Sequence, residues 1–404
     1  MKKSTNHTTV KKTLPYGQQW ISDDDINEVL RTLKSDFITQ GPKVSEFEGL
    51  VANYVGAKYA VAVSSGTAAL HTACFAAGIS EGDEVITSPL TFVASSNSVL
   101  YVGGKPVFAD IELGTYTIDT AEIKRNITTK TKAIIPVDFA GHPCELDEIM
   151  RIAKKNNLCV IEDAAHALGA EYKERKIGSI ADMTVLSFHP VKHITTGEGG
   201  MVLTNNEKFY QKLLLFRTHG ITKDSNRFIN KDLAFSLNPK TKKVEVNPWY
   251  YEMQELGYNY RMTDFQCALG ITQLKKLDLF VERRRWIVSR YNAAFKKLKN
   301  VIVPIEKDGA KSSYHLYVIR IDFRNIGKSR AQVMSELKER GVGSQVHYIP
   351  VHLQPYYRSR FGYVDSDFPN TMTFYQQALS LPLYPKMADN DVESVIRAVT
   401  NIIG

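Results

Sequence analysis

The sequence has few cysteines, and their spacing excludes two classes of protein. The four cysteines are spread along a chain of 404 residues and form no CxxC pair and no Cys/His cluster. A disulfide framework or a zinc site would need such groupings, so we expect no metal and four buried thiols in a reducing cytoplasm. The residues are Cys74, Cys144, Cys159 and Cys267.

Long apolar runs are also missing. No run approaches the roughly 20 residues that a membrane-spanning helix needs, so we expect a soluble protein without a membrane partner. Residues 1–12 are polar and basic and lack the apolar core of a signal peptide. We interpret them as a frayed tail and expect a cytoplasmic location.

A strong excess of one charge is absent from most of the chain, although the net charge is +8. The basic residues are dispersed among 43 acidic ones, and the densest cluster, 283–285, resembles a solvated helix face. There is no basic helix or aromatic RNA-binding signature, so we expect no nucleic-acid partner. A weak positive field suits small anionic ligands equally well.

Short β-rich runs alternate with amphipathic helical runs between residues 59 and 204. Strands that are apolar on both faces and separated by helices predict an α/β fold with a mostly parallel sheet covered on both sides. In such sheets ligands bind beyond the carboxyl ends of the strands. The expected strands are 59–65, 84–88, 106–111, 132–139, 159–164 and 184–189, and the expected helices are 67–77, 92–102 and 145–157.

The second half of the sequence indicates a smaller α+β domain. Residues 223–246 are polar without a clear period and predict a long, mobile loop or insertion. A continuous helical pattern follows at 264–298. We therefore expect a large domain at 14–275 and a small one at 276–404, the latter containing strands at 314–322 and 345–351 and a helix at 330–341.

Lys192 is the first candidate for chemistry. It lies just after the expected strand 184–189 and before a Gly-rich turn, where its side chain should face the ligand crevice. A lysine that is desolvated there can lose its proton and attack an aldehyde. Taken alone, the segment is equally compatible with an exposed lysine in a turn.

Three further residues complete a possible pyridoxal-phosphate (PLP) site. Asp163 ends an apolar strand, where a carboxylate could pair with a pyridinium nitrogen, although an Asp at this place can also cap the next helix. Thr67 stands at a helix start whose free amides suit a phosphate. Phe92 could stack on a flat ring or be an ordinary core aromatic. With Lys192, they form the working parts of a PLP site.

Several motifs resemble those of the DegT/DnrJ/EryC1/StrS family of sugar aminotransferases over nearly the whole chain. They are SSGTAAL, TFVAS, EDAAHALG, SFHPVKHITTGEGG, LGYNYRMTDFQCALG and VHYIPVH. The resemblance implies PLP-dependent transferase fold type I, like aspartate aminotransferase, and a homodimer whose active sites are shared. It makes Lys192 the lysine bound to PLP. The cofactor-binding residues that it implies are Thr67, Ala68, Phe92, Asp163, His166, Ser187, Lys192 and, from the neighbouring subunit, Asn259.

Within the family, the motifs VDFAGHP and HALGAEY are most similar to those of the enzymes of pseudaminic acid biosynthesis. That similarity implies amino transfer from L-glutamate to C-4 of a UDP-4-keto-6-deoxy-HexNAc, namely UDP-2-acetamido-2,6-dideoxy-β-L-arabino-hex-4-ulose. His166 stands where many relatives have Gln, which fits this branch. The residues implied to contact the sugar nucleotide are Tyr16, Asp36, Phe37, Ile38, Thr39, Gln345, Val346, His347 and Tyr348.

Two alternatives share this fold. A PLP-dependent sugar dehydrase would carry histidine in place of Lys192, so the lysine favours an aminotransferase. A non-enzymatic regulator would need neither a nucleophilic amine nor its carboxylate partner Asp163. Both residues are present, and the sequence therefore predicts an enzyme.

Overall fold

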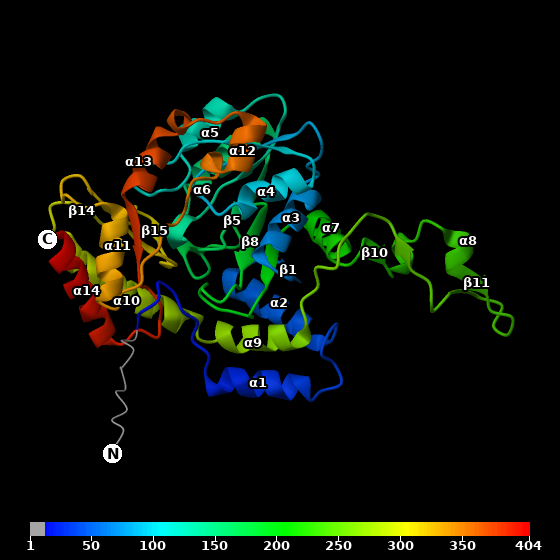
Figure 1. Cartoon of the computed structure of the whole chain (residues 1–404). Coiled ribbons are helices and arrows are strands. Elements are labelled where there is room, and N and C mark those ends of the chain that lie inside the picture. The colour runs from blue at the N-terminus through cyan, green and yellow to red at the C-terminus, as the bar shows by residue number, and fades with distance from the viewer. Residues whose placement is uncertain (1–12) are drawn as a thin grey trace, which may run out of the picture.

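A seven-stranded sheet lies at the centre of the molecule (Figure 1). The computed structural model describes residues 13–404, so the tail expected at 1–12 lies outside the described residues. Strand β9 runs antiparallel to the other six strands, which run parallel to one another, and the predicted mostly parallel sheet is confirmed. In spatial order the strands are β1 (Tyr59–Val63), β9 (Gly200–Thr204), β8 (Met183–Ser187), β5 (Cys159–Asp163), β4 (Thr131–Ile135), β2 (Glu84–Thr87) and β3 (Lys105–Phe108).

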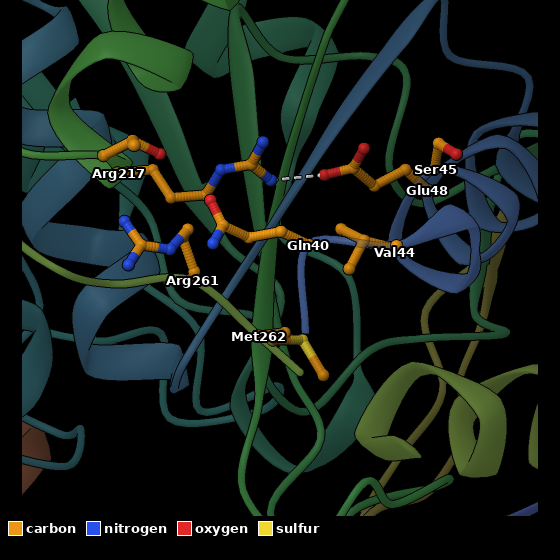
Figure 2. A pocket seen from close by; sticks show the side chains of 9 residues that line it. Gln40, Val44, Ser45, Glu48, Arg217, Arg261 and Met262 are labelled. Atoms are coloured by element: carbon orange, nitrogen blue, oxygen red, sulfur yellow. Dashed lines mark hydrogen bonds and ion pairs between the residues drawn. The ribbon is translucent and has the colours of Figure 1, made fainter. Parts of the chain in front are cut away.

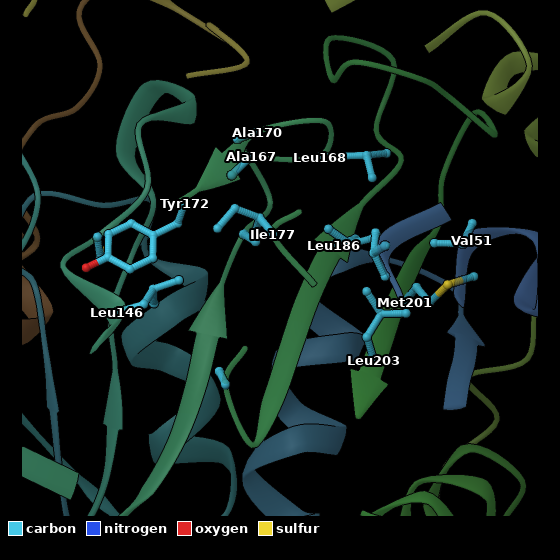
Figure 3. Close-up of a cluster of buried hydrophobic side chains, with 14 of the residues drawn as sticks. Val51, Leu146, Ala167, Leu168, Ala170, Tyr172, Ile177, Leu186, Met201 and Leu203 are labelled. Atoms are coloured by element: carbon cyan, nitrogen blue, oxygen red, sulfur yellow. The ribbon is translucent and has the colours of Figure 1, made fainter. Parts of the chain in front are cut away.

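Helices cover both faces of this sheet, because side chains that alternate along each strand are apolar on both sides. Figure 3 shows part of one core, where Val51 lies near Leu186 and Met201 of the sheet and Leu146 lies beside Tyr172. A second core on the other face contains residues of α3, α4 and α7. The helices are α2 (Pro42–Val55), α3 (Gly66–Ala76), α4 (Ala94–Tyr101), α5 (Thr120–Asn126), α6 (Leu146–Asn156) and α7 (Glu207–Arg217), with the short η1 (Phe139–Gly141).

The helical pattern at 264–298 forms two helices, so the prediction of one continuous helix is wrong. Helix α9 (Asp264–Leu274) packs against α1 (Asp23–Leu33), and α10 (Leu277–Phe295) follows after a two-residue break. The break is fixed by Lys276, whose ammonium group lies 2.6 Å from the buried carboxylate of Asp25. An ion pair at this depth holds the turn in one place.

The basic cluster 283–285 was expected to be a solvated helix face, but Arg284 at its centre is buried. Arg284 is only 1% exposed and donates hydrogen bonds to the carbonyls of Tyr314, His315 and Leu383. Burial lowers its pKa to about 9, and no carboxylate within residues 13–404 pairs with it. Its guanidinium group is therefore inaccessible to the phosphates of a nucleic acid.

The C-terminal part of the chain has its own hydrophobic core, which is built around a three-stranded antiparallel sheet. Leu14, the first residue of the predicted large domain, packs into this core and pairs with Val342. The domain boundaries 14–275 and 276–404 stay a prediction. The expected strand at 345–351 is wrong: only Gln345 pairs, with Ser380, and Pro350 has no N–H to continue a ladder. The elements are β14 (Val301–Ile302), β16 (Tyr317–Ile321), β17 (Ala378–Leu381), α11 (Arg330–Glu339) and α14 (Asp389–Ile403).

One C-terminal segment returns to the large domain and packs near β3 and α4. The hydroxyl of Tyr357 donates to Asn97 Oδ1 at 2.7 Å and lies 2.8 Å from Ser96 Oγ, and its ring packs on Phe108. The segment therefore joins the two halves of the chain. It contains η3 (Val351–Leu353), α12 (Pro355–Phe361), η4 (Asp365–Asp367) and α13 (Pro369–Gln377).

The stretch at 223–246, predicted to be a long loop, contains regular elements and projects away from the body (Figure 1). A hairpin of β11 and β12 is its tip, and the pairing of β10 with β13 closes its base. The elements are β10 (Ile221–Thr222), η2 (Ser225–Arg227), α8 (Lys231–Ala234), β11 (Phe235–Leu237), β12 (Val244–Val246) and β13 (Glu252–Met253). A small separate sheet is formed by β6 (Glu171–Tyr172), β7 (Arg175–Lys176) and β15 (Ala310–Lys311).

Two smaller findings concern thiols and membranes. The cysteines are free, and three are buried as expected, but Cys159 is only partly buried. Within residues 13–404, no helix has the length and apolar character needed to cross a bilayer.

Candidate active site

Lys192 lies in the turn that leads from β8 to β9, at the carboxyl edge of the sheet. Its backbone N–H donates to the carbonyl of His189 at 2.9 Å, which fixes the turn. Burial lowers the pKa of its amine to about 8, and the negative charge of Asp163 opposes this effect. A lysine with such a pKa is partly deprotonated near neutral pH and can act as a nucleophile.

Asp163 ends β5 and faces the same crevice. Ser95 Oγ donates to Asp163 Oδ2 at 2.6 Å, and the N–H of Ala165 donates to Oδ1 at 3.2 Å. Burial raises the pKa of this carboxyl group, while both hydrogen bonds and the charge of Lys192 lower it. Ser95 was not among the predicted site residues, although it lies in the first turn of α4, three positions after Phe92.

The start of α3 approaches the end of β8 closely enough to form a cradle. A Cβ atom on Gly66 would lie 2.9 Å from the Cβ of Ser187, so only glycine fits without a shift. Thr67 lies in the first turn, where backbone amides have no intrahelical acceptor. The amide of Ala68, in contrast, already donates to Ser65 Oγ at 3.0 Å, and an anion would have to share it.

Aromatic side chains form one wall of the crevice. Phe92 is 56% exposed, so it is not an ordinary core aromatic, and its ring centroid lies 5.9 Å from that of Tyr348. Tyr16 lies against His347 with 4.9 Å between ring centroids. An exposed ring at this edge is available to stack on a flat ligand.

His166 connects this wall to η1. The N–H of Ala140 points at its Nδ1 at 3.3 Å, and its Nε2 lies 3.1 Å from the hydroxyl of Tyr348. Burial and the charge of Lys192 keep the pKa of His166 well below its ordinary value, so the ring is neutral. Since a backbone N–H can only donate, the ring proton is on Nε2 and is donated to Tyr348. The hydroxyl proton of Tyr348 is therefore free for another acceptor.

Other predicted residues lie elsewhere in the same chain. Residues 36–39 are exposed, and Thr39 pairs with Thr263 at the start of α9. Gln273, near the other end of α9, lines the same small cavity as Lys192. A helix of this length spans about 15 Å, so residues 36–39 lie well away from Lys192. Asn259 is exposed and pairs with Thr218.

A cavity of about 290 Å³ is lined by chain neighbours of residues 36–39 and of Asn259, and Figure 2 shows its lining. Arg217 donates to Glu48 at 2.6 Å, and Arg261, two positions after Asn259, also lines it. Gln40 directly follows the predicted run 36–39. These two predicted contact regions therefore lie at one polar face, apart from the Lys192 crevice.

A pair of buried carboxyl groups lies on the opposite face of the sheet, directly behind Asp163. Glu162 and Asp138 are both 0% exposed, and Thr184 Oγ1 donates to Glu162 at 2.7 Å. Glu162 Oε1 and Asp138 Oδ2 have no partner among the described residues unless one proton joins them. Burial raises the pKa of Glu162 to about 7 and, together with the charge of Glu162, raises that of Asp138 well above its ordinary value.

This pair predicts a pH-dependent stability. In the folded state Glu162 keeps its proton up to about pH 7, whereas the ordinary pKa of glutamate is 4.5. Between these two pH values the folded state therefore binds more protons than the unfolded state. The free energy of unfolding should therefore fall as the pH rises through this window, by on the order of 2 kcal/mol. In Glu162→Gln that fall should be smaller, as measured by urea unfolding at pH 5.5 and pH 8. Glu336→Gln, at a partly exposed ion pair with Lys328, is the matched control, and parallel curves for all three proteins would contradict the prediction.

The comparisons with known proteins agree with this geometry. Residues 19–400 match the DegT/DnrJ/EryC1/StrS aminotransferase family. The chain is 44% identical to the spore coat polysaccharide biosynthesis protein SpsC of Bacillus subtilis. It is 39% identical to the UDP-4-amino-4,6-dideoxy-N-acetyl-β-L-altrosamine transaminase of Campylobacter jejuni. Each of these matches covers 96% of this chain and 97% of the relative.

Solved structures give the same result. The Helicobacter pylori aminotransferase PseC, involved in the biosynthesis of pseudaminic acid, superposes with a TM-score of 0.87 at 31% identity, covering 97% of this chain and 99% of that one. The Streptococcus pneumoniae protein Spr1654, solved in PLP and PMP forms, superposes with a TM-score of 0.86 at 31% identity, over 96% of this chain and 97–98% of that one.

The fold and the relatives define a PLP-dependent sugar aminotransferase of fold type I. The chain belongs to the DegT/DnrJ/EryC1/StrS aminotransferase family. The predicted family, fold and enzyme class are thus confirmed, and relatives with PLP and PMP bound imply the same cofactor here.

The exposure of Phe92 gives a prediction on cofactor affinity. Phe92→Leu should weaken binding of pyridoxamine phosphate about 2- to 13-fold, because a stacked aromatic pair contributes roughly 0.5–1.5 kcal/mol. Quenching of tryptophan fluorescence in an equilibrium titration measures the effect. Tyr101→Leu removes another half-exposed aromatic at the far end of α4 and is the control. Equal affinities for the two variants would contradict a stacking role.

Proposed function

We propose that this protein transfers the amino group of L-glutamate to C-4 of a UDP-4-keto-6-deoxy-HexNAc, with PLP as cofactor and Lys192 as its lysine. The observation that carries the proposal is the meeting of Lys192 and Asp163 at one edge of the sheet, each affecting the pKa of the other. The preferred sugar is UDP-2-acetamido-2,6-dideoxy-β-L-arabino-hex-4-ulose, for pseudaminic acid or a related amino sugar. The 39% identity to the C. jejuni transaminase supports this choice.

The residues present fit PLP. When bound, PLP supplies an aldehyde for an amine and a pyridinium ring that withdraws electrons. Asp163 would hold the ring nitrogen, and Phe92 and His166 would lie against the ring. The cradle of Gly66 and Ser187, with Thr67 and a shared Ala68 amide, would hold the phosphate because it combines free amides with a position that admits only glycine.

In this proposal Lys192 is the group that moves the protons. Its Nζ takes the proton from Cα of glutamate in the first half of the reaction and delivers one to C-4 of the sugar in the second. Tyr348 has a free hydroxyl proton, because His166 donates to its oxygen, and burial raises its pKa so that it keeps this proton. Tyr348, with Tyr16, His347 and the neighbouring residues 345–346, would bind the sugar nucleotide.

We further propose a cytoplasmic homodimer in which residues 36–39 and Asn259 complete the active site of the neighbouring subunit. Their exposure and their place apart from Lys192 support this arrangement, since a ligand in the Lys192 crevice of the same chain would not reach them. Mixing Asn259→Ala with Lys192→Ala subunits would test it. Recovered activity in the mixture supports shared sites, and its absence contradicts them.

An absorbance experiment tests the function. The yellow holoenzyme should bleach with L-glutamate, regain its colour with the UDP-4-keto sugar, and yield a 4-amino sugar nucleotide by mass spectrometry. A protein that never binds PLP would refute the enzyme proposal. Bleaching without recovery would keep the aminotransferase and refute this sugar. A second 4-keto sugar nucleotide belongs in the assay, because the identity to SpsC, at 44%, exceeds that to the altrosamine transaminase.

A further inference from the structure

Ser95, which donates a hydrogen bond to Asp163, also contacts a second buried hydroxyl group. Its Oγ lies 2.6 Å from Oδ2 of Asp163 and 2.7 Å from Oγ1 of Thr91, a residue in the loop between β2 and α4. Thr91 is 3% exposed, Ser95 1% and Asp163 5%. Because the three groups are shielded from solvent, their hydrogen bonds must be made within the protein.

The chemistry of the three groups fixes the direction of these hydrogen bonds. An ionised carboxylate only accepts, so Ser95 donates its single proton to Asp163. The carbonyl of Phe92, 3.4 Å from Ser95 Oγ, is the poorer acceptor for that proton. Two oxygens 2.7 Å apart need a proton between them, and only Thr91 can still supply it. The hydrogen bonds therefore run from Thr91 to Ser95 and from Ser95 to Asp163.

The contact between Thr91 and Ser95 also closes a short segment of chain around Phe92. Within residues 13–404 the hydroxyl of Thr91 has Ser95 as its hydrogen-bond partner and no other. Phe92 lies between the two in sequence and is 56% exposed, whereas both hydroxyl residues are buried. Residues 91–95 thus present a ring to the crevice and two hydroxyl groups to the carboxylate at the end of β5.

We propose that Thr91 is a positioning residue, which holds Ser95 as the donor to Asp163 so that this carboxylate keeps its charge for the ring nitrogen of PLP. The inference rests on the proposed role of Asp163. A hydroxyl group that accepts a hydrogen bond donates its own proton more strongly, by roughly 10–30% of the bond. It is also prevented from turning that proton toward Thr91. Thr91 acts through Ser95 and need not touch PLP or the substrate.

The test is the pH at which the PLP-bound protein changes colour, measured by absorbance at equilibrium and without turnover. Protonation of the nitrogen that joins Lys192 to PLP gives the yellow form, and a positive ring nitrogen opposes this protonation. Thr91→Val removes the hydroxyl group and keeps the branched shape. The midpoint should rise by about 0.2 to 0.5 pH units, because a weaker donor to Asp163 leaves less positive charge on the ring. Thr91→Ser keeps the hydroxyl group and should stay within about 0.1 pH units of the unmodified protein.

Thr87→Val is the matched control, because it is the same substitution at another buried threonine nearby. Thr87 is 0% exposed at the end of β2, and its Oγ1 donates to the carbonyl of Ile135 at 2.8 Å, not to the chain that ends at Asp163. The midpoint of this variant should be unchanged. If Thr91→Val does not fold, Thr91→Ala takes its place and should give the same rise.

A double substitution shows whether Thr91 acts through Ser95. Ser95→Ala should raise the midpoint more than Thr91→Val does, and adding Thr91→Val to it should cause no further change, since the donor is already lost. No rise in Thr91→Val, an equal rise in Thr87→Val, or additive effects in the double variant would overturn the proposal.

Asp163→Asn separates this proposal from the function on which it rests. Its midpoint should rise more than that of Thr91→Val, because the ring nitrogen loses its anionic partner. A protein without a yellow form, or an unchanged midpoint in Asp163→Asn, would refute the role of Asp163 and with it that of Thr91. A rise in Asp163→Asn without any effect of Thr91→Val would refute the role of Thr91 alone.

Discussion

Lys192→Ala should lower kcat for amino transfer at least about 10³-fold, the largest effect expected for any single substitution, because no other amine is placed to move the protons. The expected defect is chemical and not structural, since within residues 13–404 only burial and the charge of Asp163 act on the side chain. Formation of 2-oxoglutarate from glutamate measures the rate.

Lys130→Ala, at an exposed lysine in the loop before β4, is the matched control and should keep full activity. Equilibrium dialysis with pyridoxamine phosphate shows whether Lys192→Ala still binds the cofactor, as it should. A variant that retains a tenth of the normal rate would contradict the assignment of Lys192.

Asp163→Asn should slow the first half-reaction on the order of 10²- to 10³-fold. An amide cannot supply the negative charge that keeps a pyridinium nitrogen protonated, although it has nearly the same shape as the carboxylate. Stopped-flow absorbance after mixing with glutamate measures this step.

Ser95→Ala is an informative comparison, because it keeps the charge of Asp163 while it removes the 2.6 Å hydrogen bond from Ser95, together with the 2.7 Å contact of Ser95 Oγ with Thr91 Oγ1. Its effect should be about 10-fold. Asp389→Asn, at an exposed ion pair with Arg283, should have no effect. Equal losses for Asp163→Asn and Ser95→Ala would show that shape, and not charge, is the contribution of Asp163.

The central sheet and the two chief candidates were predictable because their signals are local. Lys192 and Asp163 each follow an apolar strand directly, and parallel strands place their carboxyl ends at one edge. The break between α9 and α10 was not predictable, since it depends on Asp25, which is 251 residues distant from Lys276. Apolar periodicity continues across the break and gives no sign of it.

Residues that approach the site from distant segments were also missed. His315 lies just before an apolar strand and has the pattern of a core residue, and nothing nearby in sequence indicates its neighbours. Its environment comes from contacts such as that of His193 with Ser313, which are 120 residues apart. Arg284 looked solvent-exposed for the same reason, because its three acceptor carbonyls belong to other segments.

The segment with Tyr357 and the pairing of Leu14 have a consequence for how the chain loses its structure. The chain crosses between its two halves at both ends, with Leu14 in the C-terminal core and Tyr357 on α4 and β3. A fragment ending at residue 275 would uncover Phe108 and leave Leu14 without its core. Neither half is a complete folding unit, so unfolding should be a single cooperative transition in which the crevice between the halves is lost together with both cores.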